Sequence, residues 1–389
     1  MVQKKWTVFL LLLFVIIFIF LLLNIPLQGP DSCNNPEILD SSEFNCLVAQ
    51  SAGCLLGTTN NNTLYCTESM GRKLCQPNIR SVLKTIGMGR LGNVMQAYAT
   101  LLYLSKYGFA AILSKYDDRM MRNAFAPEAY IFREGAILGD VPVTTIASVN
   151  KYNEYFYDEF IENVDKYRYN RILSVGAYPS PYYLFYTIRE ELKNHFQFHE
   201  DIQAAAFDAI EKSSKIIREK YAGKKLVKVA IHARRGDYLR HQNEILRDYM
   251  IDEKMWKKYF DHCINLLRKR IDNKTTKSVF FMASEDTEWL KKNFGQEPDI
   301  AFPGDISNLP GSKMPPRDLF LISICDHLIR SFGTFGLWGG MWTKGTVMYA
   351  YTGTHINTEE HSIRVNSSSW EAIDLNQFRT KNNKSGKSN

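Results

Sequence analysis

Between residues 225 and 351, short apolar strands alternate with helices, and this alternation constrains the fold more than any other feature of the chain. Runs of apolar and aromatic residues predict strands at 225–231, 278–282 and 346–351. Asp252 is placed to cap a helix whose apolar residues recur at helical spacing, namely Trp256, Phe260, Cys263, Leu267 and Ile271. Further helices are expected over 288–294, 318–329 and from Thr334, with a strand near 328–332. Strands and helices in this order form a parallel, doubly wound α/β sheet.

A second pattern of the same kind begins near Ser81. A strand at 82–86 leads through a glycine-rich turn to a helix at about 93–107, and the next strand is expected at 109–113. The following residues, up to about 220, carry weaker periodicity apart from helical spacing over 184–198. We therefore expect two facing Rossmann-like, doubly wound domains, at 81–221 and 222–376, followed by a disordered tail at 377–389.

The N-terminus predicts a membrane anchor. Lys4 and Lys5 precede the uncharged apolar run 6–23, in which only Thr7 is polar. This run approaches the length needed to span a bilayer, and no small-residue cleavage site follows it. We expect a cytoplasmic tail at 1–5, a signal anchor at 6–25 and a luminal chain beyond it. A cleaved signal peptide is the alternative.

The segment 26–80 has the composition of a short stem in a luminal protein. It holds five of the seven cysteines and several prolines, with little periodicity: Cys33, Cys46, Cys54, Cys66 and Cys75. An oxidising compartment favours disulfides among them, but their odd number leaves the pairing open. Four glycosylation sequons agree with a luminal chain, at Asn61, Asn273, Asn366 and Asn383. No Cys/His spacing predicts a metal site.

The net charge of +7 comes from scattered Lys and Arg residues without a long basic run, which disfavours nucleic-acid binding. The charge that matters is local. Arg234 and Arg235 follow the strand at 225–231, and ligands of open α/β sheets bind at the carboxyl ends of strands. Paired guanidiniums suit a diphosphate, because each can fork onto two oxygens. Two alternatives are a solvated surface turn and an adhesive loop formed by Arg235, Gly236 and Asp237.

Gly87, Gly89 and Gly92 match the dinucleotide-binding fingerprint, and Asp117 follows at about the distance of its ribose-binding acid. This motif predicts an alternative function, a luminal dinucleotide-dependent oxidoreductase. A tight turn that needs positive φ explains the same glycines without a ligand.

Two further groups of candidate binding residues lie where predicted strands end. The carboxylates of 284–286 can bind a nucleotide, act as a base or cap a helix, and the helix start at Thr334 offers free N–H groups to an anion.

Several motifs together resemble one family, the galactoside α-1,2-fucosyltransferases of glycosyltransferase family 11. They are His232-Ala233-Arg234-Arg235-Gly236-Asp237-Tyr238, Gly89-Arg90-Leu91-Gly92-Asn93-Val94-Met95, residues 281–289, and residues 318–338 with Gly333-Thr334-Phe335-Gly336. Val94 departs from the Gln that the family usually has, and residues 115–220 match weakly. The resemblance covers roughly residues 83–352.

The resemblance implies a GT-B-like architecture and transfer of L-fucose from GDP-fucose to the 2-hydroxyl of a terminal galactose, with inversion and without cofactor or metal. It also implies roles in the binding of GDP-fucose for His232, Arg234, Arg235, Asp286, Thr334 and Phe335. Arg234 is expected on the β-phosphate as a catalytic residue. Our candidate for the catalytic base is Asp237, the carboxylate nearest the arginines in the sequence, and Glu285 is the other candidate. Two alternatives stay open: Asp237 only pairs with an arginine, or a dissociative transition state needs little base.

From the first domain, Arg90 and Asn93 are expected on the acceptor side of the cleft. The expected partners are therefore GDP-fucose, galactose-terminated glycans and, through the anchor, the membrane, in a single-pass type II Golgi protein. The sequence leaves open the acceptor glycan, the disulfide pairing, the species and the oligomeric state, including a homo-oligomer.

Overall fold

A computed structural model describes residues 54–59, 62–69, 72–75, 81–107, 110–126, 135–136, 143–145, 171–175, 182–240, 251–306, 309–353, 363 and 367–379. The expected anchor at 6–25 and most of the expected tail at 377–389 lie outside these residues. Within them, no helix is both long enough and apolar enough to cross a membrane.

The second unit is built on six parallel strands: β9 (Lys225–His232), β10 (Thr276–Ala283), β11 (Ile300–Ala301), β12 (His327–Arg330), β13 (Val347–Tyr351) and β14 (Trp370–Asp374). Their order across the sheet is β11-β10-β9-β12-β13-β14. This is the doubly wound order in which the chain starts at the centre and reverses direction between β9 and β12. The predicted parallel, doubly wound sheet is therefore confirmed for this unit.

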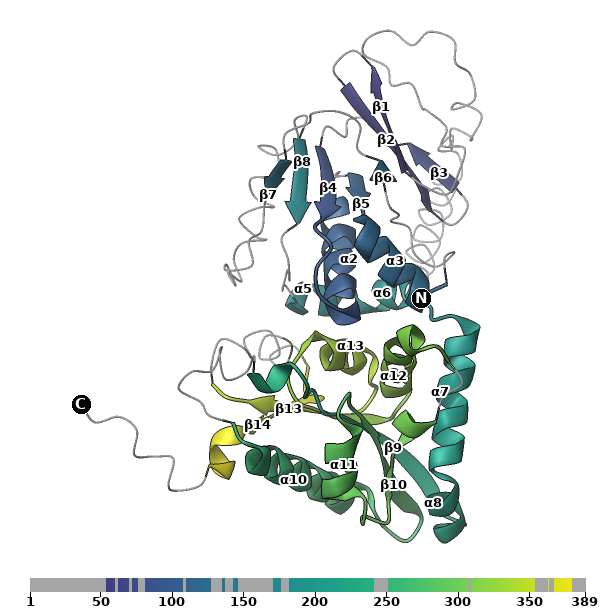
Figure 1. The fold of residues 1–389 in the computed structure, drawn as a ribbon, viewed down its shortest axis with the longest axis vertical. Helices are drawn as coiled ribbons and strands as arrows, with labels where there is room; N and C mark the ends of the chain where they lie inside the picture. Colours follow the sequence, from purple (N-terminus) through teal and green to yellow (C-terminus); the bar gives the residue numbers. More distant parts are fainter. Residues whose placement is uncertain are drawn as a thin grey trace, which may run out of the picture.

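Helices cover both faces of this sheet (Figure 1). On one face lie α10 (Glu253–Ile271) and α11 (Thr287–Phe294), and on the other lie α12 (Met314–Ser323) and α13 (Thr334–Trp342). Successive residues of β9 alternate between the two apolar cores: Val229 and Ile231 pack with α10, whereas Ala230 packs with α12 and α13. The side-chain alternation of a strand buried on both faces produces this division.

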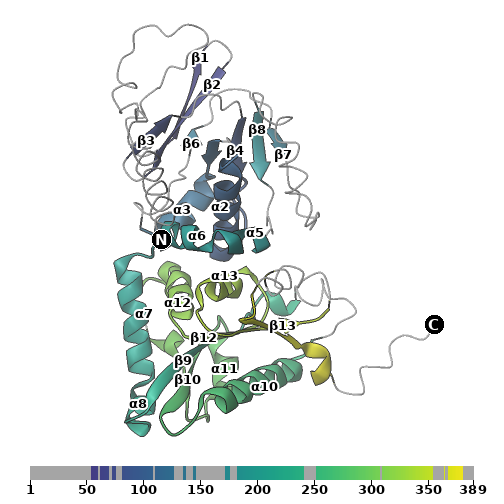
Figure 2. The same ribbon diagram turned by 180° about the vertical axis from the view of Figure 1, so that it is seen from behind.

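The first unit has a smaller parallel sheet in the order β5-β4-β8-β7 (Figure 2). Its strands are β4 (Ser81–Thr85), β5 (Ala110–Ile112), β7 (Val143–Thr145) and β8 (Arg171–Val175), and its helices are α2 (Leu91–Ser105), α3 (Lys115–Ala124), α5 (Tyr182–Thr187) and α6 (Arg189–His195). The expected βαβ start is confirmed. The helix expected over 184–198 is two helices, α5 and α6, because the chain breaks at Ile188.

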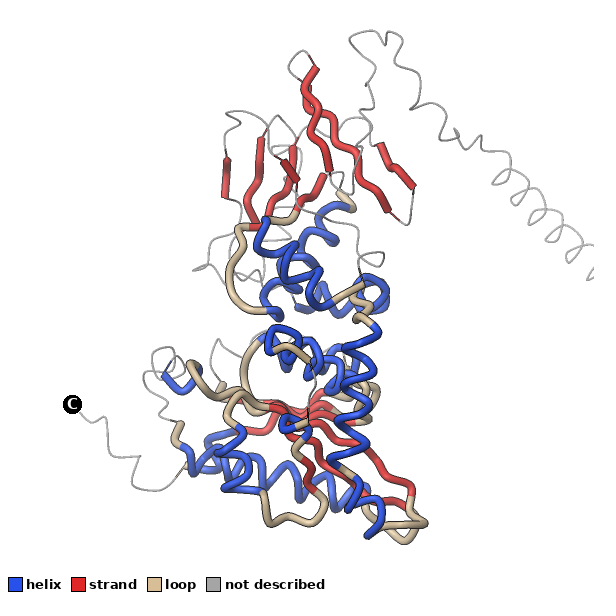
Figure 3. The backbone as a smooth tube through the Cα atoms, turned by 45° about the vertical axis from the view of Figure 1, so that its right-hand side comes forward, coloured by secondary structure: helices blue, strands red, loops and turns tan. Residues whose placement is uncertain are grey.

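The two units share an apolar core rather than facing each other across an open gap. Trp338 of α13 is fully buried and stacks on Phe185 of α5, with ring centroids 5.9 Å apart. Phe196, which follows α6, meets Trp338 edge-on at 5.5 Å. The tube view shows α13 and α2 stacked between the two parallel sheets (Figure 3).

Two helices continue from the first unit along the second, α7 (Glu200–Ser213) and α8 (Lys215–Lys220). Both lie before residue 221, where we expect the boundary between the two domains. In the structure α7 runs beside α12, and Phe207 contacts Phe320 of that helix at 5.6 Å (Figure 1). The change of unit therefore lies nearer residue 199.

Three of the four strands of a third sheet lie in the segment 26–80, where we expect a short stem with little periodicity. Its order is β3-β2-β1-β6, from β1 (Cys54–Thr59), β2 (Asn62–Ser69), β3 (Arg72–Cys75) and β6 (Gly135–Ala136). Strands β1, β2 and β3 are antiparallel, and two asparagines separate the paired ends of β1 and β2. Asparagine favours short hairpin loops, so the signal was present in the sequence.

Two further boundaries differ from the expectation. The helix expected over 318–329 is α12, which begins at Met314 and ends at Ser323, with two prolines in its first turn where the missing N–H groups are harmless. The C-terminal segment forms β14 and the 3-10 helix η6 (Leu375–Phe378), so ordered structure continues past residue 376. Two short 3-10 helices, η3 (Pro303–Asp305) and η4 (Gly311–Lys313), precede α12.

Candidate functional site

The candidate site lies where the sheet of the second unit reverses direction, at the carboxyl ends of β9 and β12. The last residues of these strands, His232 and Arg330, are directly paired. The chain segments that follow are joined by two hydrogen bonds, from the Ser331 N–H to the His232 carbonyl (3.0 Å) and from the Arg234 N–H to the Ser331 hydroxyl (2.7 Å). A crevice for ligands is expected at such a point in an open α/β sheet.

Arg234 points its guanidinium between two carboxylates. It donates to Glu285, which follows β10, and its Nη2 lies 2.5 Å from Oδ1 of Asp237. The side chain is mostly buried and lies against Gly333 and the ring of Tyr238. Arg234 is thus a fixed cation at the strand end, as the sequence predicted.

Arg235 points elsewhere. Its side chain is only 3% exposed and donates to Asp286 (2.8 Å) and Glu253 (2.9 Å). The guanidinium also lies over the ring of Trp289, 4.0 Å from its centroid. These contacts attach the arginine turn, by which we mean residues 233–238 after β9, to the first turns of α10 and α11. The buried Arg235 also excludes the adhesive-loop alternative, because the Arg-Gly-Asp tripeptide does not present its arginine to a partner.

Asp286 is the N-cap of α11 and accepts a hydrogen bond from the Trp289 N–H at 3.1 Å. Burial tends to raise the pKa of Asp286, but the hydrogen bonds from Arg235 and from the Trp289 N–H outweigh burial and lower it. The carboxylate is therefore charged and engaged with protein groups, in the capping arrangement that we weighed against nucleotide binding. Glu253, the other partner of Arg235, was missed because nothing near it in the sequence marks it.

His232 is buried beside two cations. Burial first, and then the charges of Arg330 and Arg234, lower the pKa of His232 to about 3. The imidazole is therefore neutral near pH 7. Its Nδ1 has no hydrogen-bond partner within the described part of the chain, and its ring lies 5.2 Å from that of Phe335. Gly336 makes this packing possible, since a Cβ there would come within 2.5 Å of Nδ1.

Arg330 is a fully buried cation of the site that sequence reasoning missed. Its Nη2 donates to the Gly333 carbonyl at 2.7 Å, and its own carbonyl accepts from the Tyr259 hydroxyl at 2.6 Å. Gly333 has φ +98°, which an L side chain rarely adopts, and α13 begins directly after it. Arg330 thus supports the turn that starts α13. An arginine at the end of an apolar strand was the available signal.

The glycine-rich turn of the first unit meets this helix start. The Thr334 hydroxyl donates to Oδ1 of Asn93 at 2.8 Å, and Nε1 of Trp338 donates to the Gly92 carbonyl at 2.8 Å. A Cβ on Gly92 would lie 2.6 Å from the Thr334 hydroxyl. The N-termini of α2 and α13 therefore converge, and both carry the positive end of a helix dipole.

This contact argues against the dinucleotide interpretation. In that motif a pyrophosphate approaches the glycine backbone, whereas here the first turn of α13 occupies the space beside Gly92. Asp117 is 1% exposed and accepts from the Ser114 hydroxyl at 2.8 Å, so it is not open to a ribose. Burial raises the pKa of Asp117, with hydrogen bonds from Thr85, Ser114 and the Gly87 N–H acting in the opposite direction.

The turn is instead a rigid support for Arg90. Gly87 and Gly89 have φ of +72° and +84°, and the Tyr116 hydroxyl donates to the Gly89 carbonyl at 2.5 Å. The Arg90 side chain is 65% exposed, and its Nη2 lies 3.4 Å from Oδ2 of Asp237. The structure thus brings Arg90 and Asn93 from the first unit to the arginine turn and helix start of the second.

Other predicted sites fall outside this region. Asn273 is exposed in the turn between α10 and β10, at the opposite end of the sheet, and its Oδ1 accepts from the Thr275 N–H at 2.8 Å. Asn61, Asn366 and Asn383 lie outside the described residues. Among the residues that the structure describes, no group of three or more His, Cys, Asp or Glu side chains is arranged to hold a metal ion.

The chain is similar to a known protein family, to individual proteins of that family and to solved structures. The family model for glycosyl transferase family 11 matches residues 54–373. Galactoside alpha-(1,2)-fucosyltransferase 2 of Hylobates lar is 26% identical over 285 residues, covering 72% of this chain and 75% of that protein. Galactoside 2-alpha-L-fucosyltransferase Sec1 of Mus musculus is 27% identical, covering 71% of this chain and 68% of that protein. Among solved structures, a mutant of Arabidopsis thaliana FUT1 in complex with GDP aligns with a TM-score of 0.45 and 11% identity over 74% of this chain and 73% of that one.

Proposed function

Since the chain belongs to glycosyl transferase family 11, we propose that it transfers L-fucose from GDP-fucose to the 2-hydroxyl of a terminal galactose. One observation connects this function to particular residues. Arg234 and the N-terminus of α13, in the second unit, lie close to Arg90 and Asn93 of the first. The first pair suits a leaving diphosphate and the second suits a sugar acceptor. The two units then have the GT-B-like arrangement, with the donor on the second and the acceptor on the first.

The donor side works through positive charge. As the bond between fucose C1 and the β-phosphate oxygen breaks, GDP leaves with the bonding electrons and the diphosphate gains charge. Arg234 can neutralise that charge with its fork of N–H groups, and the free N–H groups in the first turn of α13 add to it. In this proposal the cation and the helix start do the work that a divalent metal does in other sugar transfers, and no cofactor takes part.

The remaining donor residues have supporting roles. Neutral His232 can donate or accept a hydrogen bond to the nucleotide, and it packs against Phe335 at the start of α13. Arg235 and Asp286 hold the arginine turn through the contact between their side chains (2.8 Å). The Thr334 hydroxyl is directed to Asn93, so Thr334 serves the diphosphate through its backbone position rather than its side chain.

On the acceptor side, the 2-hydroxyl of galactose must lose its proton. Either a base takes this proton, or the transition state is dissociative enough to need little base catalysis. The acceptor 2-hydroxyl attacks C1 from the face opposite to GDP, which inverts the configuration, and its proton passes to a base or to water. Asp237 and Glu285 are the carboxylates at hand, and both are paired with Arg234.

The assignment is tested with the full-length chain. It is incubated with GDP-fucose and a panel of galactose-terminated acceptors, and the linkage in the product is determined by NMR. We expect α-linked fucose on O2 of galactose. Fucose on another hydroxyl, or hydrolysis of GDP-fucose without any transfer, would overturn the assignment.

The cellular place of the protein is a separate part of the proposal. The apolar run at 6–23 after Lys4 and Lys5 supports a single-pass type II anchor with the enzyme in the Golgi lumen. The sequon at Asn273, which is exposed at the end of the sheet away from the candidate site, agrees with that orientation. A protease-protection assay on microsomes tests it: residues 26–389 should be protected, and cleavage within them by external protease would contradict the orientation.

A further inference from the structure

Asp237 links the two units at the candidate site. One of its oxygens, Oδ1, lies 2.5 Å from Nη2 of Arg234 in the second unit, and the other, Oδ2, lies 3.4 Å from Nη2 of Arg90 in the first. One carboxylate therefore contacts the cation proposed for the donor and the cation proposed for the acceptor side.

The backbone on either side of this link is fixed. Arg90 follows the turn with two positive-φ glycines that Tyr116 holds by its hydrogen bond to Gly89. Arg234 is held by the hydrogen bond from its N–H to Ser331. The side chains of Asp237 and Arg90 are 54% and 65% exposed, against 13% for that of Arg234, so the carboxylate and Arg90 have room to move and Arg234 does not.

A diphosphate and the two carboxylates compete for Arg234. Its Nη1 donates to Glu285 and its Nη2 to Asp237, so both terminal nitrogens already contact anions. A phosphate held by the guanidinium fork needs such nitrogens and brings its own negative charge. Glu285 is 33% exposed against 54% for Asp237 and lies against Gly236, where a Cβ would come within 2.9 Å of its Oε1, so Glu285 has less room to move. Asp237 has a second cation available in Arg90.

We propose that a diphosphate on Arg234 displaces Asp237, which then pairs with Arg90 alone and fixes the Arg90 side chain for the acceptor. This inference rests on the proposed function, because it takes the donor and acceptor sides from it. Asp237 becomes a positioning residue through which donor binding raises the affinity for the acceptor. Binding is then ordered, with the donor first, and Arg90 is oriented only when there is fucose to transfer.

The test measures the coupling between two bound molecules by calorimetry on the full-length chain. GDP is the donor probe and lactose the acceptor probe, and the lactose Kd is measured with and without saturating GDP. In the wild type GDP should tighten lactose binding roughly tenfold, within the usual range of coupling between sites. In Asp237→Asn the two lactose affinities should agree within about twofold, while GDP alone binds as tightly as before or more tightly, because its competitor has lost its charge.

Two further variants locate the coupling. Arg90→Gln should abolish it in the same way, since the released carboxylate then has no cation to fix. Asp208→Asn, which removes an exposed carboxylate paired with Lys212 on α7, is the matched control and should keep the wild-type coupling. Tenfold coupling in Asp237→Asn, or its loss in Asp208→Asn, overturns the inference. Independent binding of GDP and lactose to the wild type also overturns it, yet leaves fucosyl transfer standing, whereas failure of the wild type to bind GDP removes both.

Discussion

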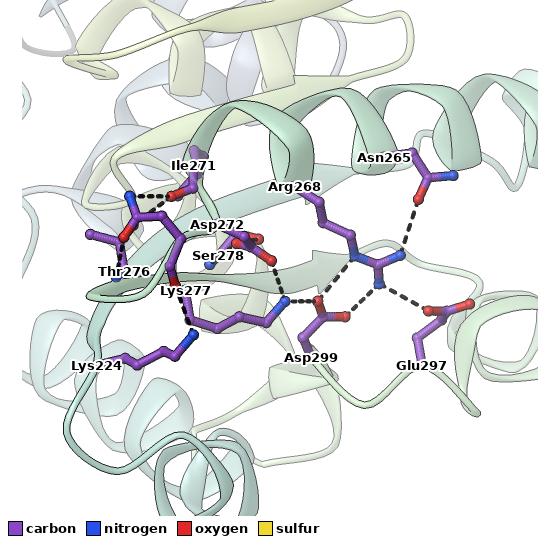
Figure 4. A network of polar contacts seen from close by, with 11 residues as sticks. Lys224, Asn265, Arg268, Ile271, Asp272, Thr276, Lys277, Ser278, Glu297 and Asp299 are labelled. Carbon is purple, nitrogen blue, oxygen red and sulfur yellow. Dashed lines mark hydrogen bonds and ion pairs between the residues drawn. The ribbon is translucent and has the colours of Figure 1, made fainter.

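Two clusters of charged side chains lie at opposite ends of strand β10, and they are built differently. At its amino end Lys277 donates to Asp272 and to Asp299 (2.7 Å), and Arg268 holds the same Asp299 (Figure 4). At its carboxyl end, around the arginine turn, Arg234 and Arg235 contact four carboxylates: Asp237, Glu253, Glu285 and Asp286. We call the first the Lys277 cluster; the second is the arginine turn together with its carboxylate partners.

The two clusters differ in the burial of their carboxylates and in how far apart in the chain their members lie. Asp299 is 2% exposed, and every residue of the Lys277 cluster lies between 268 and 299. The arginine turn takes partners from both units and keeps half-exposed carboxylates, with Asp237 at 54% and Glu253 at 64%. A closed, fully paired cluster joins a helix to two strands, whereas a cluster with exposed anions can exchange partners with a ligand. The contrast separates a structural role from a functional one.

The contrast predicts its largest effect at Arg234. Arg234→Ala should lower kcat/KM for GDP-fucose by about 10³-fold, the usual cost of losing a preorganised donor to a developing charge. The melting temperature should stay within a few degrees. Arg234→Lys should also be strongly impaired, because an ammonium has no fork of N–H groups. Steady-state kinetics together with thermal melts measure both quantities, and a variant that loses stability instead of rate would place Arg234 with the structural residues.

Asp299→Asn should show the reverse pattern. It leaves Lys277 and Arg268 without their shared buried anion, and breaking a buried ion pair costs about 3 kcal/mol or more of unfolding free energy. The kcat of the folded fraction should equal that of the wild type, since the cluster is at the far end of the sheet. Urea titration and kinetics on the same samples decide this, and a fall in kcat without loss of stability would contradict the division of roles.

Arg235→Met tests the arginine turn from within. Because Arg235 contacts Asp286, Glu253 and Trp289, its loss should cost about 2 kcal/mol in unfolding free energy, the scale for buried hydrogen bonds to charged groups. Activity should fall less than in Arg234→Ala, through misplacement of the turn. Denaturant curves and kinetics for the two variants side by side provide the measurement. Equal losses of activity without destabilisation would mean that both arginines contact the donor.

Acid should affect the candidate site and the Lys277 cluster in different pH ranges. The folded pKa of His232 is about 3 against 6.5 for the unfolded chain, so the unfolded state binds the proton first and stability falls as the pH drops below 6.5. From pH 7 to pH 5 this one group should cost about 2 kcal/mol. His232→Asn should reduce that dependence, as measured by urea unfolding at each pH. An unchanged slope would mean that His232 can be protonated in the folded protein.

The Lys277 cluster should resist the same acidification. Burial tends to raise the pKa of Asp272, but its hydrogen bonds to Lys277 and Ser278 outweigh burial and lower the pKa below the usual 3.8. Its stabilising contribution is therefore fully present above that value and is lost only as the pH falls through the lowered one. The difference in stability between wild type and Asp272→Asn should stay constant from pH 7 to pH 5.

The sequence predicts the helices and strands that form the site better than it predicts which partners the side chains of the site contact. Alternating apolar residues predict β9. Asp252 and Asp286 cap α10 and α11, because the side-chain oxygen of each accepts a hydrogen bond from the N–H of the third residue after it. Such signals are local, so one sequence suffices to find them. The different roles of the two arginines, with Arg234 at the candidate site and Arg235 held by protein groups, cannot be found from local sequence. They depend on Glu253 and Trp289, which lie far from the arginines in the chain.

Long-range contacts also explain what was missed. Arg330 belongs to the site only because β12 pairs with β9, and Gly92 belongs to it only because α13 approaches. The glycine pattern at 87–92 matched a nucleotide-binding motif since both need positive φ and close approach, and the sequence does not say what approaches. Strand β14 was missed because the residues before it carry no pattern that joins it to the sheet.

The apolar core shared by the two units bears on how the molecule comes apart. Two Rossmann-like units with separate cores would melt as two transitions, but here Trp338 of one unit is buried among Phe185 and Phe196 from the other. Unfolding either unit exposes the core of both, so calorimetry should record a single cooperative transition. A cut between α6 and α7 would leave each piece with an exposed aromatic face, and neither piece should be obtained as a folded, monomeric protein.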